Sequence, residues 1–246
     1  ESLPEASQGD QCQIFFSLYQ SATVMDGIPH IMLVHDIIPE IFPEYQRTLR
    51  KQFFWSRVRQ AIQKATNIIT VSEHTKNDIL KHFALDKNMI EVCMPGVDPL
   101  FQQELLLPEK ARVALKYSLP PRYIYHGGGL EVRKNTEIVL RAYASLLRIL
   151  PERERLPLVI SGTIHSESNP LATPVRALIR ELGIEEKVIL LGYVSKEDLP
   201  SLYALAQMFV YPSRYEGFGL PVLEAMTVGV PVITTRVSSL PEVGGT

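Results

Sequence analysis

The sequence predicts an α/β fold with two domains, each built around a parallel sheet. Short, continuously apolar runs alternate along the chain with helical patterns, which is typical of parallel strands covered by helices on both faces. The 246 residues, 46% hydrophobic and 21% charged, suffice for two small soluble domains. A polar stretch around Pro108 interrupts the alternation between residues 102 and 117. We therefore expect one domain over residues 1–105 and a second over 106–246.

Nine apolar runs rich in β-branched and aromatic residues predict the strands. They cover residues 13–17, 31–35, 67–71 and 89–94 in the first domain, and 122–126, 158–162, 187–191, 208–211 and 231–234 in the second. The runs are short and bounded by turn residues, which favours strands over buried helix segments.

Start signals precede several of the helices expected between these strands. Ser72 is placed to cap a helix that begins at Glu73. Ser195 stands three residues before Asp198, which is the spacing of a capping box. Asn135 is expected to cap a helix with an apolar stripe, and the stripe consists of Val139, Ala142, Tyr143, Leu146, Leu147 and Leu150. Such stripes predict core contacts rather than ligand chemistry.

The segment 215–226 carries the most informative pattern in the chain. It combines two carboxylates, two glycines and a proline helix start, at Glu216, Gly217, Gly219, Pro221 and Glu224. Proline suits the first turn of a helix because its missing N–H would have no partner there. Glycines let the backbone approach a ligand closely, and free N–H groups at a helix start favour an anion. The segment therefore suits a ligand with a polyol at one end and a phosphate at the other.

This segment resembles the Glu-x7-Glu signature of retaining glycosyltransferases of family 4, which have the GT-B fold. The similarity continues through residues 229–235 and 240–245. It implies two Rossmann-like domains whose parallel sheets face a cleft. The N-terminal domain, on the acceptor side, is expected to be incomplete, because the opening strand and helix and the family's glycine-rich N-terminal loop are not in these residues. The chain begins Glu1-Ser2-Leu3 without Met or a signal-peptide pattern, which we interpret as a segment of a longer protein.

The resemblance also implies roles for residues around the signature. Glu216, with Gly217 and Phe218, would hold hydroxyls of the donor sugar, and Glu224 would hold the nucleotide ribose. The turn that contains Tyr193 and Val194 resembles the family turn that meets the nucleobase through backbone groups.

A second motif lies at the end of the strand expected over residues 122–126. Three glycines are followed by two adjacent cations, Arg133 and Lys134, and the carboxyl ends of such strands are where ligands bind. An Arg can hold a phosphate with two hydrogen bonds, while a Lys acts as a point charge. The stretch resembles the family's phosphate-binding segment. The donor diphosphate is therefore expected at Gly128, Gly129, Arg133, Lys134, Gly219 and Leu220. Some members carry an Arg where this chain has Gly128, so Arg133 and Lys134 remain as the cationic clamp. Neighbouring His126 is expected to support this motif.

His35 and Asp36 follow the strand expected over residues 31–35. By resemblance they correspond to the family's active-site histidine segment, which approaches the donor sugar and the acceptor. We expect His35 and Glu216 to be the catalytic residues.

Residues 47–64 contain six basic side chains, no acid and several aromatic residues. One interpretation is an ordinary helix with its apolar face on the sheet and its charges in water. The other is a basic amphipathic helix that contacts anionic lipid or a lipid-linked acceptor, as a peripheral membrane protein would.

Several classes of site and partner are not expected. The sequence contains no Asp-x-Asp, no P-loop, no His-Glu-x-x-His and no cysteine pair with metal spacing, so neither a metal nor a cofactor is predicted. A net charge of −2 gives no argument for nucleic acid binding. Cys12 and Cys93 form no disulfide framework, which favours a cytoplasmic location.

The predicted activity is metal-independent transfer of a hexose from a nucleotide sugar to a glycan or lipid-linked hydroxyl, with retention of configuration, in polysaccharide biosynthesis. The loop after His35 resembles mannosyltransferases, so GDP-mannose is the first expected donor, and UDP-glucose or UDP-N-acetylglucosamine is the next. Three alternatives stay open: a nucleotide-sugar epimerase of the same fold, a phosphorylase, for which no pyridoxal lysine site is found, and an inactive nucleotide-sugar-binding fragment.

Overall fold

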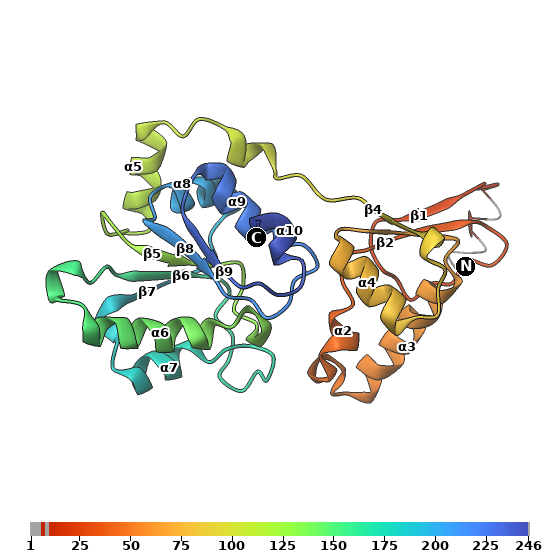
Figure 1. Cartoon of the computed structure of the whole chain (residues 1–246), viewed down its shortest axis with the longest axis horizontal. Helices are drawn as coiled ribbons and strands as arrows, with labels where there is room; N and C mark the ends of the chain where they lie inside the picture. The colour runs from red at the N-terminus through yellow and green to blue at the C-terminus, as the bar shows by residue number, and fades with distance from the viewer. Residues whose placement is uncertain (1–5, 8–9, 246) are drawn as a thin grey trace. The chain divides into compact units, whose positions relative to one another are not determined.

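The computed structural model describes residues 6–7 and 10–245 and divides into two α/β units (Figure 1). The first unit comprises residues 1–95 together with 216–218, and the second comprises residues 96–215 and 219–246. All nine predicted strands are present, and every strand pair is parallel.

The first unit contains a four-stranded sheet whose strands follow the order of the chain. The strands are β1 (Phe15–Ser17), β2 (His30–Val34), β3 (Asn67–Thr70) and β4 (Ile90–Val92). The α-helices are α2 (Ile38–Ile41), α3 (Leu49–Lys64) and α4 (Glu73–His82). Buried residues of β2, β3, α3 and α4 make one core, which includes Met32, Val34, Trp55, Val58, Ile62, Ile68 and Ile79. The predicted cap of α4 is confirmed, because the Ser72 side chain accepts a hydrogen bond from the Thr75 amide.

The second unit contains a five-stranded sheet in the order β7-β6-β5-β8-β9. The strands are β5 (Ile124–His126), β6 (Leu158–Ser161), β7 (Val188–Gly192), β8 (Met208–Tyr211) and β9 (Val232–Thr234). The helices are α5 (Leu107–Lys116), α6 (Thr136–Ile149), α7 (Val175–Leu182), α8 (Leu199–Ala204), α9 (Leu220–Val228) and α10 (Leu240–Gly244). Figure 1 shows α6 and α7 on one face of this sheet and α8 and α9 on the other. The strand order reverses between β5 and β8, and ligands bind at such a switch point in open α/β sheets.

Two predicted helix caps in the second unit are wrong. Asn135 has a left-handed backbone with φ of 61° and makes no side-chain cap; its amide instead donates to the Pro212 carbonyl. Ser195 does not cap either, because its hydroxyl donates to the Asp198 carboxylate. In both cases a partner distant in sequence or a buried charge takes the side chain from its local role.

The predicted apolar stripe of α6 is partly wrong. Ala142 and Leu146 are exposed, whereas Leu140 and Ala144 are buried together with Val139 and Tyr143. The helix begins at Thr136, which is itself buried, so the row that follows Thr136 at intervals of three and four residues faces the sheet. Helix α9 begins at Leu220, one residue before the predicted start.

Candidate functional site

The candidate donor site lies in the second unit at the carboxyl ends of β5 and β8. Strand β5 ends at His126 and continues into a loop of residues 127–135, here called the β5–α6 loop. Strand β8 ends at Tyr211 and continues into residues 212–215. These two loops leave the sheet on either side of the switch point, so the topology brings the predicted cations next to the segment that leads into Glu216.

Hydrogen bonds join the two loops along their length. The Arg133 carbonyl accepts from the Arg214 amide at 2.8 Å and from the Ser213 hydroxyl at 3.1 Å. The Arg133 guanidinium donates to the Tyr215 carbonyl at 3.0 Å. The side-chain amide of Asn135 also donates a hydrogen bond to the Pro212 carbonyl. The loops therefore form one continuous hydrogen-bonded structure that holds Arg133 and Lys134.

Lys134 is buried, with 5% of its surface exposed. Its ammonium group donates a hydrogen bond to the Tyr211 hydroxyl and lies 5.1 Å from the centroid of the Tyr211 ring. A buried ammonium group is costly unless polar or aromatic groups compensate it. The surroundings of Lys134 thus keep a cation in a setting of low dielectric, where its attraction for an anion is stronger than in water.

The backbone and the surroundings of Gly128 both favour glycine. Its φ is +89°, and a Cβ there would lie 3.0 Å from both the Pro221 ring and the Tyr211 ring. A side chain at this position would press on the start of α9 and on the aromatic ring that supports Lys134, so these groups would have to shift by a few tenths of an ångström. The glycine therefore permits the β5–α6 loop to pass close to α9.

The loop between β8 and α9 carries the first signature carboxylate. Glu216 is 7% exposed, and residues 216–218 group with the first unit. There the Gly217 carbonyl accepts hydrogen bonds from the hydroxyls of Ser72, at 2.6 Å, and Thr75, at 3.2 Å. These two hydrogen bonds fix the Gly217 carbonyl. The next residue, Phe218, is partly buried.

Helix α9 presents its first turn after this loop. Gly219 is the residue before the helix, has φ of +117° and makes no side-chain cap, and Leu220 opens the helix. The first N–H groups of a helix have no partner inside it, and Pro221 contributes none. The predicted anion contact of the Gly219 and Leu220 backbone would use these N–H groups, and it stays a prediction.

The second signature carboxylate, Glu224, lies on α9 and is partly buried. It accepts a hydrogen bond from the Tyr203 hydroxyl of α8 at 3.2 Å. Burial raises the pKa of Glu224, and the hydrogen bond from Tyr203 and the charge of Lys196 counteract only part of that rise. Such a carboxylate is suited to accept hydrogen bonds from ligand hydroxyls that replace its missing solvent.

The turn after β7 contains Tyr193 and Val194, which the structure places in different environments. Tyr193 is 77% exposed, whereas Val194 is 7% exposed and belongs to the core. The Val194 side chain is thus unavailable to a ligand, and only backbone groups of this residue could contact a base.

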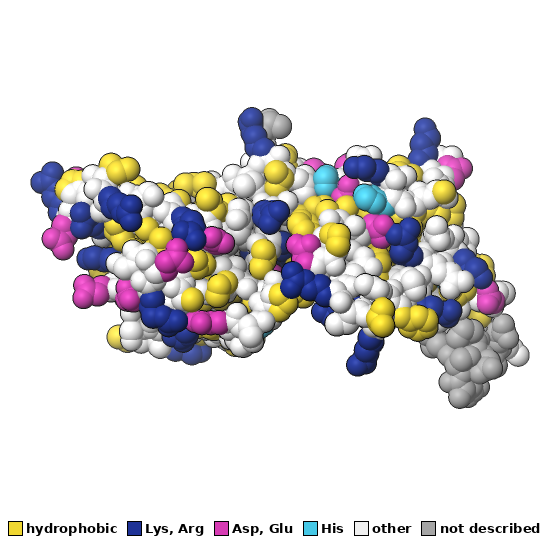
Figure 2. Space-filling view, turned by 90° about the horizontal axis from the view of Figure 1, so that it is seen from below, with side chains coloured by type: hydrophobic (Ala, Val, Ile, Leu, Met, Phe, Trp, Pro, Cys, Tyr) yellow, Lys and Arg dark blue, Asp and Glu magenta, His cyan; other side chains and the backbone are white. Residues whose placement is uncertain are grey.

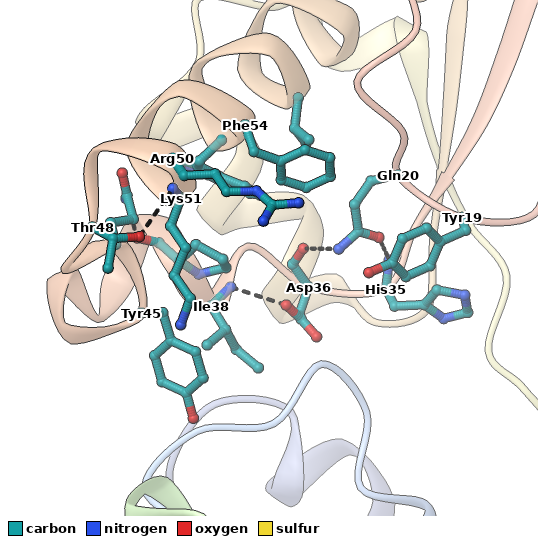
Figure 3. A pocket seen from close by; sticks show the side chains of 14 residues that line it. Tyr19, Gln20, His35, Asp36, Ile38, Tyr45, Thr48, Arg50, Lys51 and Phe54 are labelled. Atoms are coloured by element: carbon teal, nitrogen blue, oxygen red, sulfur yellow. Dashed lines mark hydrogen bonds between the residues drawn. The ribbon is translucent and has the colours of Figure 1, made fainter. Parts of the chain in front are cut away.

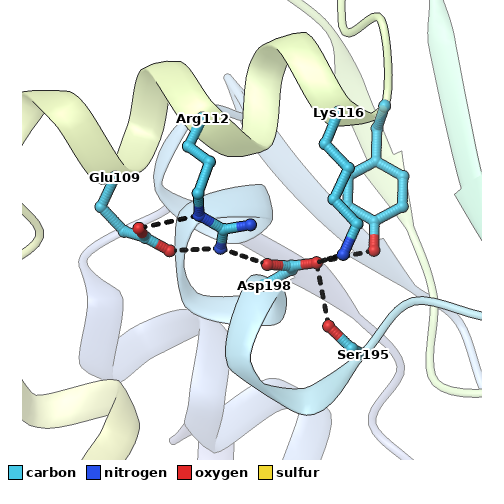
Figure 4. Close-up of polar contacts among 6 residues, drawn as sticks. Glu109, Arg112, Lys116, Ser195 and Asp198 are labelled. Atoms are coloured by element: carbon cyan, nitrogen blue, oxygen red, sulfur yellow. Dashed lines mark hydrogen bonds and ion pairs between the residues drawn. The ribbon is translucent and has the colours of Figure 1, made fainter.

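A buried carboxylate, which the sequence suggested only as part of a capping box, fixes this turn. Asp198 accepts hydrogen bonds from Arg112, Lys116, Tyr117 and Ser195 (Figure 4). Burial alone would raise the pKa of Asp198, but the hydrogen bonds from its partners outweigh burial and hold that pKa well below its usual range. The network joins α5 to the start of α8. The cations of this network lie more than 80 positions away from Asp198 in the sequence, so no local pattern predicts the network.

In the first unit, His35 follows β2 and lines a cavity of about 850 Å³. Its imidazole Nε2 lies 3.2 Å from the Leu18 carbonyl, and its ring is 6.5 Å from that of Tyr19. Figure 3 shows Tyr19 and His35 on one side of the cavity and side chains of α3 on the other, among them Arg50, Lys51 and Phe54. Asp36, next to His35, caps the following helical turn through the Ile38 amide. The cavity therefore combines aromatic walls with two cations.

Helix α3 has both a buried face and an exposed apolar edge. Trp55, Val58 and Ile62 belong to the core, as an ordinary helix on a sheet would require. Leu49, Phe53 and Phe54 are 83%, 69% and 55% exposed. The face shown in Figure 2 mixes charges of both signs with hydrophobic side chains. No helix in the described part of the chain has the length and apolar character to cross a bilayer.

The described residues contain no group of three or more His, Cys, Asp or Glu side chains arranged to hold a metal ion. The donor-site groups within the second unit are instead cations, backbone amides and the carboxylate of Glu224. Such a set has the chemistry to bind a polyanion with hydroxyl groups.

Known proteins resemble this chain in sequence and in fold. The family model of the glycosyl transferases group 1 matches residues 109–245, and that of glycosyltransferase family 4 matches residues 12–100. The O-antigen chain mannosyltransferase B of Escherichia coli is 38% identical over 230 residues, which are 89% of this chain and 57% of that protein. The serotype-specific mannosyltransferase WbdA of Escherichia coli is 28% identical over 232 residues, 92% of this chain and 28% of the relative.

Solved structures with low sequence identity support the fold. WaaG, a glycosyltransferase involved in lipopolysaccharide biosynthesis, superimposes with a TM-score of 0.74 at 21% identity, over 98% of this chain and 64% of WaaG. Anabaena HepE in complex with UDP-glucose superimposes with a TM-score of 0.70 at 19% identity, over 87% of this chain and 55% of HepE.

The chain spans little more than half the length of the first of these relatives. The two family models together nevertheless cover most of this chain, one for each predicted domain. The predicted α/β fold with two parallel sheets is confirmed. The chain belongs to the glycosyl transferases group 1, within glycosyltransferase family 4, and has the GT-B fold.

Proposed function

We propose that the protein transfers a hexose from a nucleotide sugar to a hydroxyl of a glycan or lipid-linked acceptor, with mannose from GDP-mannose as the first candidate. The observation that carries this proposal is the meeting of Arg133 and Lys134 with the segment that leads into Glu216. Two mannosyltransferases among the relatives support mannose, and the fold neighbour in complex with UDP-glucose supports a nucleotide-sugar donor. UDP-hexoses are the second candidate.

In this proposal the second unit stabilises the leaving diphosphate. Negative charge builds on the diphosphate as the bond to the sugar breaks, so preorganised cations and amides lower the barrier. Arg133 and Lys134 supply the charge, and the backbone at Gly128, Gly129, Gly219 and Leu220 supplies N–H donors. The buried setting of Lys134 strengthens its interaction with phosphate.

The remaining contacts to the donor would come from the two signature carboxylates and from the turn after β7. Glu216, with Gly217 and Phe218 beside it, would hold hydroxyls of the sugar. Glu224 would hold the ribose, because burial makes it a strong site for hydroxyl donors. Backbone groups of Tyr193 and Val194 would meet the base.

His35 would orient groups at the reacting face, with Glu216 as the second catalytic residue. We place no covalent nucleophile in this reaction. A front-face displacement with retention of configuration fits that assignment, since the acceptor hydroxyl then attacks from the side that the diphosphate leaves.

The acceptor would approach the cavity of the first unit lined by His35, Arg50, Lys51 and Phe54. The exposed apolar edge of α3 supports a second element of the proposal, contact with an anionic membrane by residues 47–64. Leu49, Phe53 and Phe54 are exposed beside cations of the same helix, which is the pattern of interfacial helices. The protein would then be cytoplasmic and peripheral at the inner face of the membrane.

Vesicle co-sedimentation tests this membrane contact. Binding to vesicles with anionic lipid is expected to fall several-fold in a Phe53→Ser/Phe54→Ser variant, whereas Ile149→Ser, another exposed apolar residue, should leave it unchanged. Equal binding by all three proteins would exclude the α3 edge as the contact.

Transfer assays on the full-length protein test the activity itself. Incubation with GDP-mannose and acceptor should give a glycosylated product with retained configuration, and EDTA should leave the rate unchanged. Conversion of the donor without acceptor would instead favour the epimerase. Donor binding without any turnover would favour a nucleotide-sugar-binding module, and loss of activity with EDTA would contradict the proposed role of Arg133 and Lys134.

A further inference from the structure

His126 is a fully buried imidazole at the last position of β5, next to the β5–α6 loop but outside the set of groups that would touch the donor. Its Nδ1 lies 2.8 Å from the Val210 carbonyl, and its Nε2 lies 2.9 Å from the Thr136 hydroxyl. Val210 belongs to β8, and Thr136 is the first residue of α6. One side chain thus joins three elements.

The directions of these hydrogen bonds follow from the chemistry of the partners. A carbonyl can only accept, so Nδ1 carries the proton and donates to Val210. In a neutral imidazole the other nitrogen is an acceptor, so the Thr136 hydroxyl donates to Nε2. Burial, with a smaller contribution from the charge of Lys134, lowers the pKa of His126 to about 4. The ring is therefore neutral near pH 7, and both hydrogen bonds are satisfied.

The two bonds close the base of the loop that carries the cations. The β5–α6 loop begins directly after His126 and ends directly before Thr136, so the bond between these residues ties its two ends together. The second bond holds Val210, whose neighbour Tyr211 contacts Lys134 through its hydroxyl and its ring. One imidazole therefore positions both the β5–α6 loop and Tyr211, the aromatic residue that contacts Lys134.

We propose that His126 is a positioning residue for the donor site, which fixes Lys134 relative to Tyr211 by joining the end of β5 to Thr136 and to Val210. This inference rests on the proposed function in one respect, that Lys134 contacts the donor diphosphate. The expected consequence is selective: a less rigid loop base weakens binding of the diphosphate and leaves the contacts of other segments to the base and ribose in place.

Thr136 allows a sharp test, because it lies outside the proposed binding groups. Thr136→Val keeps the shape and removes the hydroxyl that donates to His126, and Thr136→Ser keeps the hydroxyl as the matched control. His126→Leu removes both bonds. The four proteins, including the unaltered chain, are titrated calorimetrically with GDP and UDP and with guanosine and uridine. Backbone hydrogen exchange of residues 127–135 is measured in parallel without ligand.

The expected result is a loss of about fivefold or more in diphosphate affinity for Thr136→Val and His126→Leu, the scale of one buried hydrogen bond, with nucleoside affinity unchanged. Exchange within residues 127–135 should rise in the same two variants, and Thr136→Ser should match the unaltered chain. Lower thermal stability with an unchanged ratio of diphosphate to nucleoside affinity would overturn the inference. If the unaltered chain binds no diphosphate, the proposed function fails. Unchanged hydrogen exchange in Thr136→Val and His126→Leu would overturn the positioning role separately.

Discussion

The chemistry of the candidate site depends on the environments of a few charged side chains. Lys134 is buried against an aromatic ring, and Glu224 is partly buried beside a tyrosine hydroxyl. Each of these groups has lost part of its hydration and so gains more from a ligand of opposite charge or matching hydrogen bonds than an exposed group would. The same residue types on an open surface would contribute little.

Replacement of Glu216 by Gln should separate sugar recognition from nucleotide binding. The change keeps the size of the side chain but removes the carboxylate charge that would hold the sugar hydroxyls. We expect a loss of about 2–4 kcal/mol in transition-state stabilisation for transfer, with affinity for the bare nucleoside diphosphate nearly unchanged. Equal losses of affinity for sugar nucleotide and diphosphate would move Glu216 to another part of the ligand.

Replacement of Lys134 by Met should weaken diphosphate binding specifically. Methionine preserves the apolar stem over the Tyr211 ring and removes the charge. A charge-assisted contact to phosphate contributes roughly 1.5–3 kcal/mol, so affinity for the diphosphate should fall about tenfold or more, while nucleoside affinity stays constant. Arg148→Ala, an exposed cation on α6, serves as the control. Unchanged diphosphate affinity in the Lys134 variant would assign the phosphates to other groups.

At the level of elements, strands were predictable and helix details were not. A strand buried on both faces is marked by a short, continuously apolar run, and β5, β6 and β8 show this directly. The absence of capping at Asn135 and Ser195 could not be inferred. Asn135 is engaged by Pro212, and Ser195 by Asp198, whose network depends on the distant Arg112 and Lys116. Local signals identify which residues can cap, and tertiary contacts decide whether they do.

The stability of the junction between β5, α6 and β8 should depend on pH, because His126 titrates differently in the folded and unfolded chain. Its folded-state pKa, about 4, lies below the value of 6.5 expected when unfolded, so the unfolded chain binds the extra proton between these values. Stability is therefore lost as pH falls from about 6.5 to about 4, by roughly 3 kcal/mol for this group alone. Urea unfolding across this window should show a steeper fall for the unaltered chain than for His126→Gln. Parallel curves would contradict the prediction.

The stability of the junction between α5 and α8 should depend on the charge of Asp198. Asp198→Asn removes the charge that pairs with Arg112 and Lys116, both of which are nearly half exposed and can be rehydrated. We therefore expect a loss of about 1–3 kcal/mol in the free energy of unfolding at pH 7. The depressed pKa of Asp198 means that this stabilisation disappears as pH falls below about 4. Glu137→Gln, which disrupts an exposed pair with Arg141, should change stability by less than about 1 kcal/mol. Denaturant unfolding of both variants checks the difference.

For the whole molecule, the sequence offered candidate residues for a donor site but not the contacts that support them. Glu216, Glu224, Arg133 and Lys134 belong to contiguous motifs, so they were recognisable one by one. The cavity beside His35 was not predicted, because its walls come from segments spread between Tyr19 and Val58. Whether Tyr193 contacts a base stays a prediction.

Calorimetric titration of the unaltered chain tests whether it holds a nucleotide sugar through the diphosphate. The ligands are GDP-mannose, UDP-glucose, GDP, UDP, guanosine and uridine. We predict that the diphosphates of one base bind at least about tenfold more tightly than the corresponding nucleoside, on the scale of one charge-assisted phosphate contact. Equal affinity for diphosphate and nucleoside, or no binding of any of the six, would contradict the account.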